Sequence, residues 1–151
     1  MKNFDIRKVP ADQIPLDLLL LADPSEQLIN SYLPNSECYA AREGDQIVGV
    51  CVLKMHSSST VEIKNIAMYP DCQGTGVGTK LLRHTINQAS LNGTKKILVK
   101  TGTFGYPPTF YQRLGFRVVA VEQDYFLTTY NEPLFESGIQ HQDRLVLELC
   151  L

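Results

Sequence analysis

Residues 73–79 read Gln-Gly-Thr-Gly-Val-Gly-Thr, and they come shortly after a strand-like stretch at 60–68. Three alternating glycines remove side chains, so the backbone can approach a ligand closely. Apolar residues then recur at helical spacing as far as an Asn-Gly pair at 92–93, which is typical of a helix end. The first N–H groups of such a helix have no partner within it, and with the helix dipole they form an anion site. The stretch therefore predicts a strand, a phosphate-binding loop and a helix, with a plain packing turn as the alternative.

Two other phosphate-binding loops fit these residues poorly. A Walker P-loop ends in Gly-Lys-Ser/Thr, whereas Gly78 is followed by Thr79 and Lys80 in the reverse order. A Rossmann fingerprint has a glycine where Thr79 stands and an acidic residue about 20 positions later. This chain has Lys95 and Lys96 at that distance. Neither a P-loop nor a dinucleotide site is therefore predicted.

The remaining chain shows strand and helix patterns in a mixed order, which implies an α+β or mixed α/β fold. The strands on either side of the helix after the glycine loop are expected to run parallel. Residues 125–139 are left unassigned, because a proline and a glycine interrupt any long element. The predicted strands are 4–9, 37–43, 46–55, 60–68, 96–100, 116–121 and 144–149. The predicted helices are 16–21, one that starts within residues 23–26 and ends before Pro34, 107–113 and one from 77 to the cap at 92–93.

Composition and charge narrow the class of protein. The 151 residues are expected to form a single domain, 1–151, and a formal net charge of -2 gives no reason to expect a nucleic-acid partner. No apolar run approaches the roughly 18 residues of a membrane span, and residues 1–10 resemble no export signal. A membrane partner is therefore not expected, and a cytoplasmic location is predicted. The spacing of the four cysteines matches no zinc template, and no metal site is predicted.

The glycine loop also fits the pattern Gln/Arg-x-x-Gly-x-Gly/Ala, through Gln73, Gly76 and Gly78. A second stretch, Phe-Tyr-Gln-Arg-Leu-Gly-Phe at 110–116, is similar to the motif Phe-Tyr-x-x-x-Gly-Phe. Through these two motifs the chain resembles the GNAT superfamily of acetyl-CoA-dependent N-acetyltransferases. The resemblance implies a GNAT-like fold, in which helices flank a central, mixed, mostly antiparallel and twisted sheet.

The resemblance covers a core of about residues 3–120, followed by a tail and last strand at 121–151. Residues 130–139 look like the tails of one branch of small-molecule acetyltransferases. The resemblance implies acetyl-CoA or CoA as cofactor, with its pyrophosphate on the glycine loop and its pantetheine arm along the backbone of the preceding strand. The expected cofactor-binding residues are Ile66, Ala67, Met68, Gln73, Gly74, Thr75, Gly76, Val77, Gly78 and Thr79.

Acetyl transfer to an amine needs a base, because an amine like that of lysine, with a pKa of about 10.4, is mostly protonated at neutral pH. The resemblance implies Glu62 for this role, since some family members have a glutamate base at that place. A strand carboxylate paired with Lys64 or another cation is the alternative explanation of Glu62. Glu37 and His56 are further candidates for the base.

The departing thiolate needs an acid, and the resemblance implies Tyr111 of the Phe-Tyr pair. A phenol has an ordinary pKa of about 10, close to that of an alkyl thiol. A tyrosine that only packs on the sheet is the alternative. The chain departs from the family at Phe104 and Pro107, where many relatives have Asn and Ala. The contact of that asparagine with the cofactor arm is therefore not carried over.

Three functions remain open from the sequence. The first is acetylation of a primary amine on a small molecule by direct transfer. The second is acetylation of a protein lysine or N-terminus, and the third is a non-catalytic CoA-binding sensor. A homodimer is a further expectation, with the strand at 144–149 as a candidate for pairing between copies.

Overall fold

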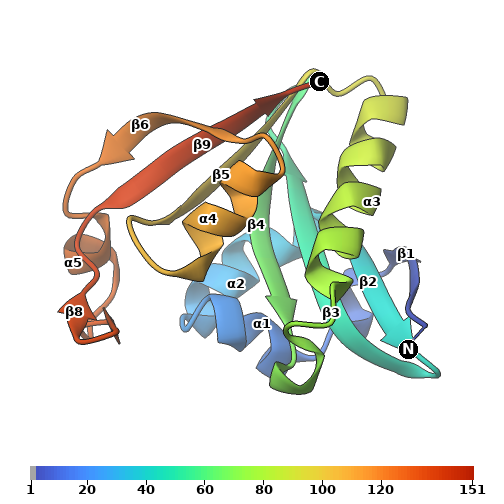
Figure 1. Cartoon of the computed structure of the whole chain (residues 1–151), viewed down its shortest axis with the longest axis horizontal. Coiled ribbons are helices and arrows are strands. Elements are labelled where there is room, and N and C mark those ends of the chain that lie inside the picture. The colour runs from blue at the N-terminus through green and yellow to red at the C-terminus, as the bar shows by residue number, and fades with distance from the viewer. Residues whose placement is uncertain (1–2) are drawn as a thin grey trace. The chain divides into compact units, whose positions relative to one another are not determined.

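The computed structural model describes residues 3–151, and their secondary structure follows the predicted order (Figure 1). These residues form two compact units, the first ending at Thr94 and the second beginning at Lys95. The glycine loop belongs to the first unit, and the Phe-Tyr motif belongs to the second.

The first unit is built on four consecutive antiparallel strands. Each strand pairs with the next along the chain, and Gly44, in the left-handed region at φ 63°, closes the predicted hairpin turn between the second and third strands. The strands are β1 (Asp5–Val9), β2 (Glu37–Glu43), β3 (Gln46–Met55) and β4 (Thr60–Met68). The helices are α1 (Leu16–Ala22), α2 (Glu26–Tyr32) and α3 (Val77–Leu91).

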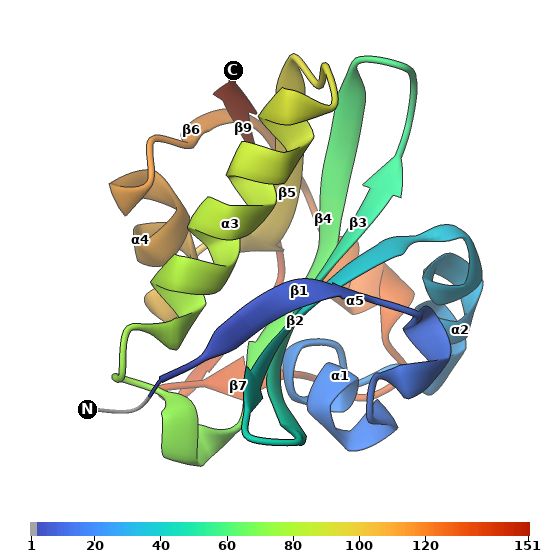
Figure 2. The ribbon, with the colours of Figure 1, turned by 90° about the vertical axis from the view of Figure 1, so that its right-hand side faces the viewer.

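Helices cover both faces of this four-stranded sheet (Figure 2). On one face, Leu18 and Leu19 of α1 and Ile29 of α2 are fully buried in a cluster with the alternating side chains Val50 and Val52 of β3. Burying one such side chain stabilises the fold by about 1.5–3 kcal/mol. The apolar stripe of α3 packs on the opposite face. This arrangement leaves the start of α3 beside the loop that follows β4.

A β-bulge interrupts β4 at Lys64. Val52 pairs with Asn65 and the next residue, Leu53, pairs with Ile63, so Lys64 is one extra residue in β4. In a regular strand, Glu62 would point to the same face as Ile66, because side chains repeat every second residue. The extra residue reverses the alternation of faces for the residues that precede it, including Glu62. Glu62, which pairs with Lys54, therefore shares the face of Val52, under α1 and α2.

The second unit has three antiparallel strands with β9 in the middle. The strands β5 (Lys96–Gly102) and β6 (Arg117–Glu122) both pair with β9 (Arg144–Cys150). Both hydrogen-bonding edges of β9 are thus used within the chain. Helix α4 (Tyr106–Arg113) follows β5.

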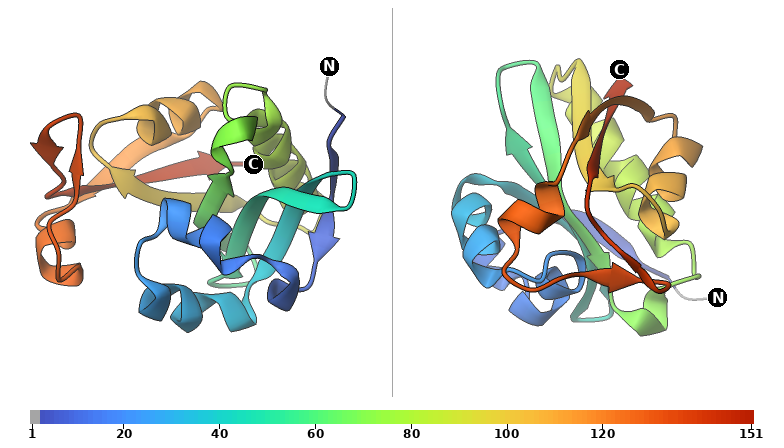
Figure 3. Two further views of the ribbon diagram at one scale, coloured as in Figure 1. Left: turned by 90° about the horizontal axis from the view of Figure 1, so that it is seen from below. Right: turned by 90° about the vertical axis from the view of Figure 1, so that its left-hand side faces the viewer.

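The segment left unassigned in the sequence has short elements of its own (Figure 3). It contains helix α5 (Tyr125–Thr129) and a hairpin of β7 (Phe135–Glu136) and β8 (Ile139–Gln140). Ser137 and Gly138, at φ 53° and 76°, form the hairpin turn. Strands of two residues show no alternation that a sequence pattern can reveal.

Candidate active site

The glycine loop has the backbone conformation that its sequence predicts. Gly74 and Gly76 have φ values of 77° and 86°, a region that residues with a side chain rarely adopt. Gly76 is the N-cap of α3, and its carbonyl oxygen accepts the first helical hydrogen bond, from the N–H of Lys80, at 3.1 Å. Thr75 closes the turn before the helix by bonding to the carbonyl oxygen of Cys72 through both its N–H and its hydroxyl group.

The beginning of α3 is suited to an anion. The backbone N–H groups ahead of Lys80 have no intrahelical partner, and the positive end of the helix dipole lies there. The first turn of α3 carries no acidic side chain that would compete with a phosphate. Val77 and Gly78 are buried, which fixes the first turn against the sheet. The loop therefore has the features of an anion site, and its binding of a pyrophosphate stays a prediction.

The strand residues expected beside the cofactor arm divide between the two faces of β4. Ala67 is buried in the cluster under α1 and α2, whereas Met68 packs in the cluster with Val77. Ile66 pairs with the buried Cys51. The side chains of Ala67 and Met68 thus belong to the two cores, and the binding of a ligand by the backbone of β4 stays a prediction.

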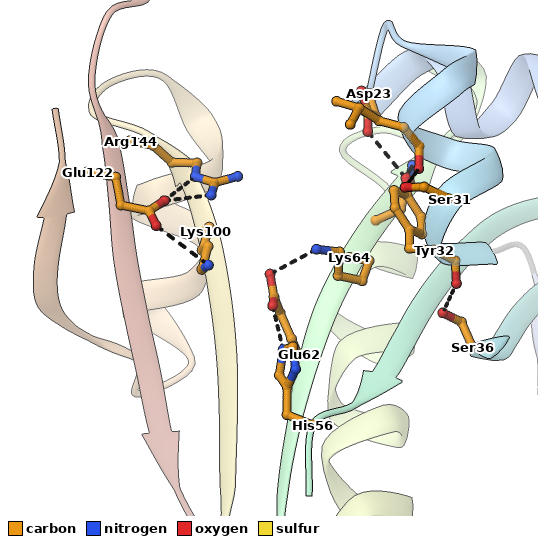
Figure 4. Close-up of polar contacts among 12 residues, drawn as sticks. Asp23, Ser31, Tyr32, Ser36, His56, Glu62, Lys64, Lys100, Glu122 and Arg144 are labelled. Atoms are coloured by element: carbon orange, nitrogen blue, oxygen red, sulfur yellow. Dashed lines mark hydrogen bonds and ion pairs between the residues drawn. The ribbon is translucent and has the colours of Figure 1, made fainter. Parts of the chain in front are cut away.

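Glu62 lies in a polar cluster on the face of the sheet that α1 and α2 cover (Figure 4). Its side chain is only 5% exposed, and each carboxylate oxygen has a cationic or hydrogen-bonding neighbour. The Nε2 atom of His56 lies 2.6 Å from Oε1, and the Nζ atom of Lys64 lies 3.4 Å from Oε2. The pairing of Glu62 with Lys64, one explanation considered from the sequence, is therefore observed. His56, considered separately as a base, is bound to the same carboxylate.

Tyr111 lies in the second unit, in an aromatic cluster. It is buried, and its ring contacts Phe110 at 5.4 Å and Phe116 at 5.7 Å between centroids. The carbonyl oxygen of Tyr111 accepts the N–H of Phe116 at 3.2 Å, which ends α4. Packing accounts for the position of the ring, and the role of its hydroxyl group as an acid stays a prediction.

Other candidates have structural partners. Glu37 forms an exposed ion pair with Lys8 at 3.8 Å on the first two strands. Phe104, which replaces the family asparagine, stacks on His141 with ring centroids 4.3 Å apart. His141 also bonds through Nε2 to Oε1 of Glu136 at 3.0 Å. Nothing in the sequence pointed to His141, because its partners lie in a loop and in a two-residue strand.

The comparisons with known proteins agree with this geometry. A family model described as an acetyltransferase (GNAT) domain matches residues 34–118, which include the glycine loop and the Phe-Tyr motif. The uncharacterized N-acetyltransferase YvbK of Bacillus subtilis is 43% identical over 136 residues, which is 89% of this chain and 88% of that protein. The chain belongs to the GNAT acetyltransferase family.

Two solved structures of this family closely match the chain. An IAA acetyltransferase from Bacillus cereus ATCC 14579 is 39% identical and has a TM-score of 0.93, covering 99% of this chain and 100% of that one. A GNAT family acetyltransferase from Elizabethkingia anophelis with acetyl-CoA bound is 38% identical, has the same TM-score of 0.93, and covers 99% of both chains. The predicted fold class, a mixed and mostly antiparallel sheet flanked by helices, is thereby confirmed. The acetyl-CoA in the second structure agrees with the cofactor predicted here.

Family membership makes the chain an acyltransferase, as predicted. Within residues 3–151, no group of three or more His, Cys, Asp or Glu side chains is placed to hold a metal ion. No helix in the same part of the chain is long and apolar enough to cross a membrane.

Proposed function

We propose that this GNAT acetyltransferase transfers the acetyl group of acetyl-CoA directly to a primary amine of a small molecule. The observation that carries the proposal is the glycine loop before α3, with two glycines at positive φ and no acidic side chain in the first helical turn. Acetyl-CoA supplies the acetyl group as a thioester. The loop residues 73–79 bind its pyrophosphate, and the backbone at Ile66, Ala67 and Met68 binds its pantetheine arm.

The acceptor amine has to lose a proton before it reacts. An amine with a pKa of about 10.4 is mostly protonated at pH 7, which lies about 3.4 pH units below that pKa. Forming the neutral amine at this pH costs roughly 4.6 kcal/mol of free energy. A buried carboxylate in a water-poor site can bind the ammonium group and accept its proton. We assign this role to Glu62, and we assign to Tyr111 the donation of a proton to the departing sulfur. The tail resemblance at 130–139 favours a small molecule as the acceptor.

The test separates the roles of the two catalytic residues from cofactor binding. We expect Tyr111→Phe and Glu62→Gln to lower kcat by about a hundredfold or more, as for the loss of a general acid or base. The Kd for acetyl-CoA, measured by calorimetry, should stay within twofold, because neither residue is assigned to the cofactor. CoA release is followed with spermidine, kanamycin, L-lysine and n-butylamine as acceptors.

The alternatives give different results in the same assays. A protein acetyltransferase would leave all four amines unreacted and acetylate lysine-containing peptides or protein N-termini. A CoA-binding sensor would bind the cofactor without turnover of any acceptor. If Tyr111→Phe weakens acetyl-CoA binding as much as it slows turnover, the tyrosine has a structural role only.

A further inference from the structure

The two oxygens of Glu62 are held very differently. Oε1 lies 2.6 Å from Nε2 of His56, the length of a strong charge-assisted hydrogen bond. Oε2 lies 3.4 Å from Nζ of Lys64, near the limit for a hydrogen bond. An ionised carboxylate only accepts hydrogen bonds, so Nε2 of His56 carries the hydrogen. One oxygen is therefore firmly bound, and the other has a loosely bound cation.

The ammonium group of Lys64 has a second favourable contact. Nζ lies 5.5 Å from the centre of the Tyr32 ring, within the distance of a cation–π interaction. The side chain of Lys64 is 27% exposed, so its ammonium group also keeps access to water. Lys64 can thus leave Oε2 without losing all compensation for its charge. Lys64 thus lies between Glu62 and Tyr32, on the side of the sheet that α2 covers.

His56 has no comparable freedom. It lies just after β3 (Gln46–Met55), in the connection to β4, and its backbone N–H bonds to the carbonyl oxygen of Thr60 at 2.9 Å. The tight turn holds the imidazole close to Glu62, and the His56 side chain is 42% exposed. Because the carboxylate is only 5% exposed, it relies on protein partners rather than water to fix its orientation.

We propose that His56 is a positioning residue for the acetyltransferase reaction. In the free protein the ammonium group of Lys64 occupies the position beside Oε2 of Glu62 that the acceptor amine takes when it binds. His56 fixes Glu62 through Oε1, so that Oε2 faces the incoming amine. The ammonium group of the acceptor replaces that of Lys64 at Oε2, and Lys64 moves toward the Tyr32 ring. The inference rests on the proposed function, because it assumes that Glu62 is the base.

The proton transfer then balances in one step. An N–H bond of the acceptor ammonium breaks, an O–H bond forms at Oε2 of Glu62, and the nitrogen keeps the electron pair with which it reacts. Before the step the carboxylate is negative and the amine positive, and after it both are neutral. His56 keeps its hydrogen on Nε2 throughout, and Lys64 stays positively charged. The acceptor is accordingly an amine that arrives as a cation.

The first experiment measures steady-state kinetics with the fastest acceptor among spermidine, kanamycin, L-lysine and n-butylamine. We expect His56→Ala to lower kcat by about tenfold to a hundredfold, as for the misplacement of a reacting group. His56→Gln keeps an N–H donor near Oε1 and should recover most of this loss. Lys64→Met should lower the acceptor KM about twofold to fivefold, because the acceptor no longer competes with a part-exposed ion pair at Oε2.

The matched control is His84→Ala. His84 is the histidine of α3, where its ring packs edge to face on Tyr39 at 5.6 Å, and its removal should leave kcat within twofold. The double variant Glu62→Gln/His56→Ala should be no slower than Glu62→Gln alone, since His56 acts through Glu62. Thermal unfolding of each variant shows whether it is folded at the assay temperature.

The outcomes distinguish this inference from the proposed function. If none of the four amines is acetylated, or if Glu62→Gln is fully active, the proposed function fails and this inference fails with it. If Glu62→Gln is impaired but His56→Ala is not, only the role of His56 is overturned. Equal losses in His56→Gln and His56→Ala, or a double variant slower than Glu62→Gln by the full His56→Ala factor, also overturn it. A higher acceptor KM in Lys64→Met overturns the role of Lys64.

Discussion

Glu122 lies at the end of β6, and two cations hold its carboxylate. Arg144 approaches Oε1 through Nε at 2.6 Å and through its terminal nitrogen at 2.5 Å, while Nζ of Lys100 lies 3.6 Å from Oε2 (Figure 4). Partial burial raises the pKa of Glu122, but the hydrogen bond and charge of Arg144, with those of Lys100, outweigh it and lower the pKa below its usual 4.5. The ionised form is therefore favoured in the folded protein.

This lowered pKa predicts a pH-dependent contribution to stability. A group whose pKa is lower in the folded state stabilises the fold above its unfolded pKa and loses this effect as the pH falls through its folded pKa. We expect Glu122→Gln to reduce the free energy of unfolding at pH 7 by about 0.5–1 kcal/mol, the range for a part-exposed pair. The difference from the unchanged protein should shrink as the pH is lowered from 5 to 2.5. Urea unfolding across this range, with the exposed Glu132→Gln as control, measures it.

At the scale of single residues, the sequence indicates which side chains are candidates for catalysis, but not which side chains contact one another. Glu62 and Tyr111 are candidates because acyl transfer needs a base and an acid, and the family resemblance implies these two places; their roles stay predictions. The contact between His56 and Glu62 could not be predicted from the sequence, because it depends on the bulge at Lys64. A bulge shifts the register without leaving a pattern of its own in the residues around it.

At the scale of elements, the glycine loop gives the sharpest prediction. Gly76→Ala places a side chain at φ 86°, which costs about 1–2 kcal/mol, although no atom lies within 4 Å of the added carbon. We expect lower stability and at least tenfold weaker binding of acetyl-CoA, because relief of the strain moves the N–H groups that we propose to hold the pyrophosphate. Denaturant unfolding and calorimetry measure the two effects.

Gly44→Ala is the matched control for this change. Gly44 has φ 63° and also has open space around it, but it lies in the hairpin between β2 and β3. The control should lose similar stability and keep its affinity for acetyl-CoA. Equal affinity of both variants would show that the loop conformation does not matter for the cofactor.

Long elements were predictable, and the elements of the tail were not. The strands β2 and β3 and the helix α3 have clear periodicity, and they appear where the sequence places them. The segment from α5 to β8 makes individual contacts instead, such as that of Phe126 with His141. Contacts between residues far apart in the sequence leave no periodic pattern to read.

At the scale of the whole molecule, ligand binding should raise thermal stability selectively. A ligand at about 100 times its Kd adds roughly 2.7 kcal/mol to the free energy of unfolding. For a chain of 151 residues this corresponds to an increase in Tm of roughly 5–10 °C. We expect the increase with acetyl-CoA and with CoA but not with NADH, because the loop lacks the Rossmann pattern. Differential scanning fluorimetry checks this, and an unchanged Tm with both CoA species would contradict the cofactor assignment.

The extra residue in β4, Lys64, determines the face of the sheet to which Glu62 points. Loss of the Lys64 codon would preserve the reading frame, yet it would restore regular alternation along the strand. The side chains before the deletion would then exchange faces, so that Glu62 would point into the apolar core beneath α3, and Val61 and Ile63 would turn toward α2. With Glu62 as the base, as proposed above, a lineage that lost this residue would need another base elsewhere in the fold. Among descendants of a common ancestor, the glutamate and the insertion should therefore be inherited or lost together.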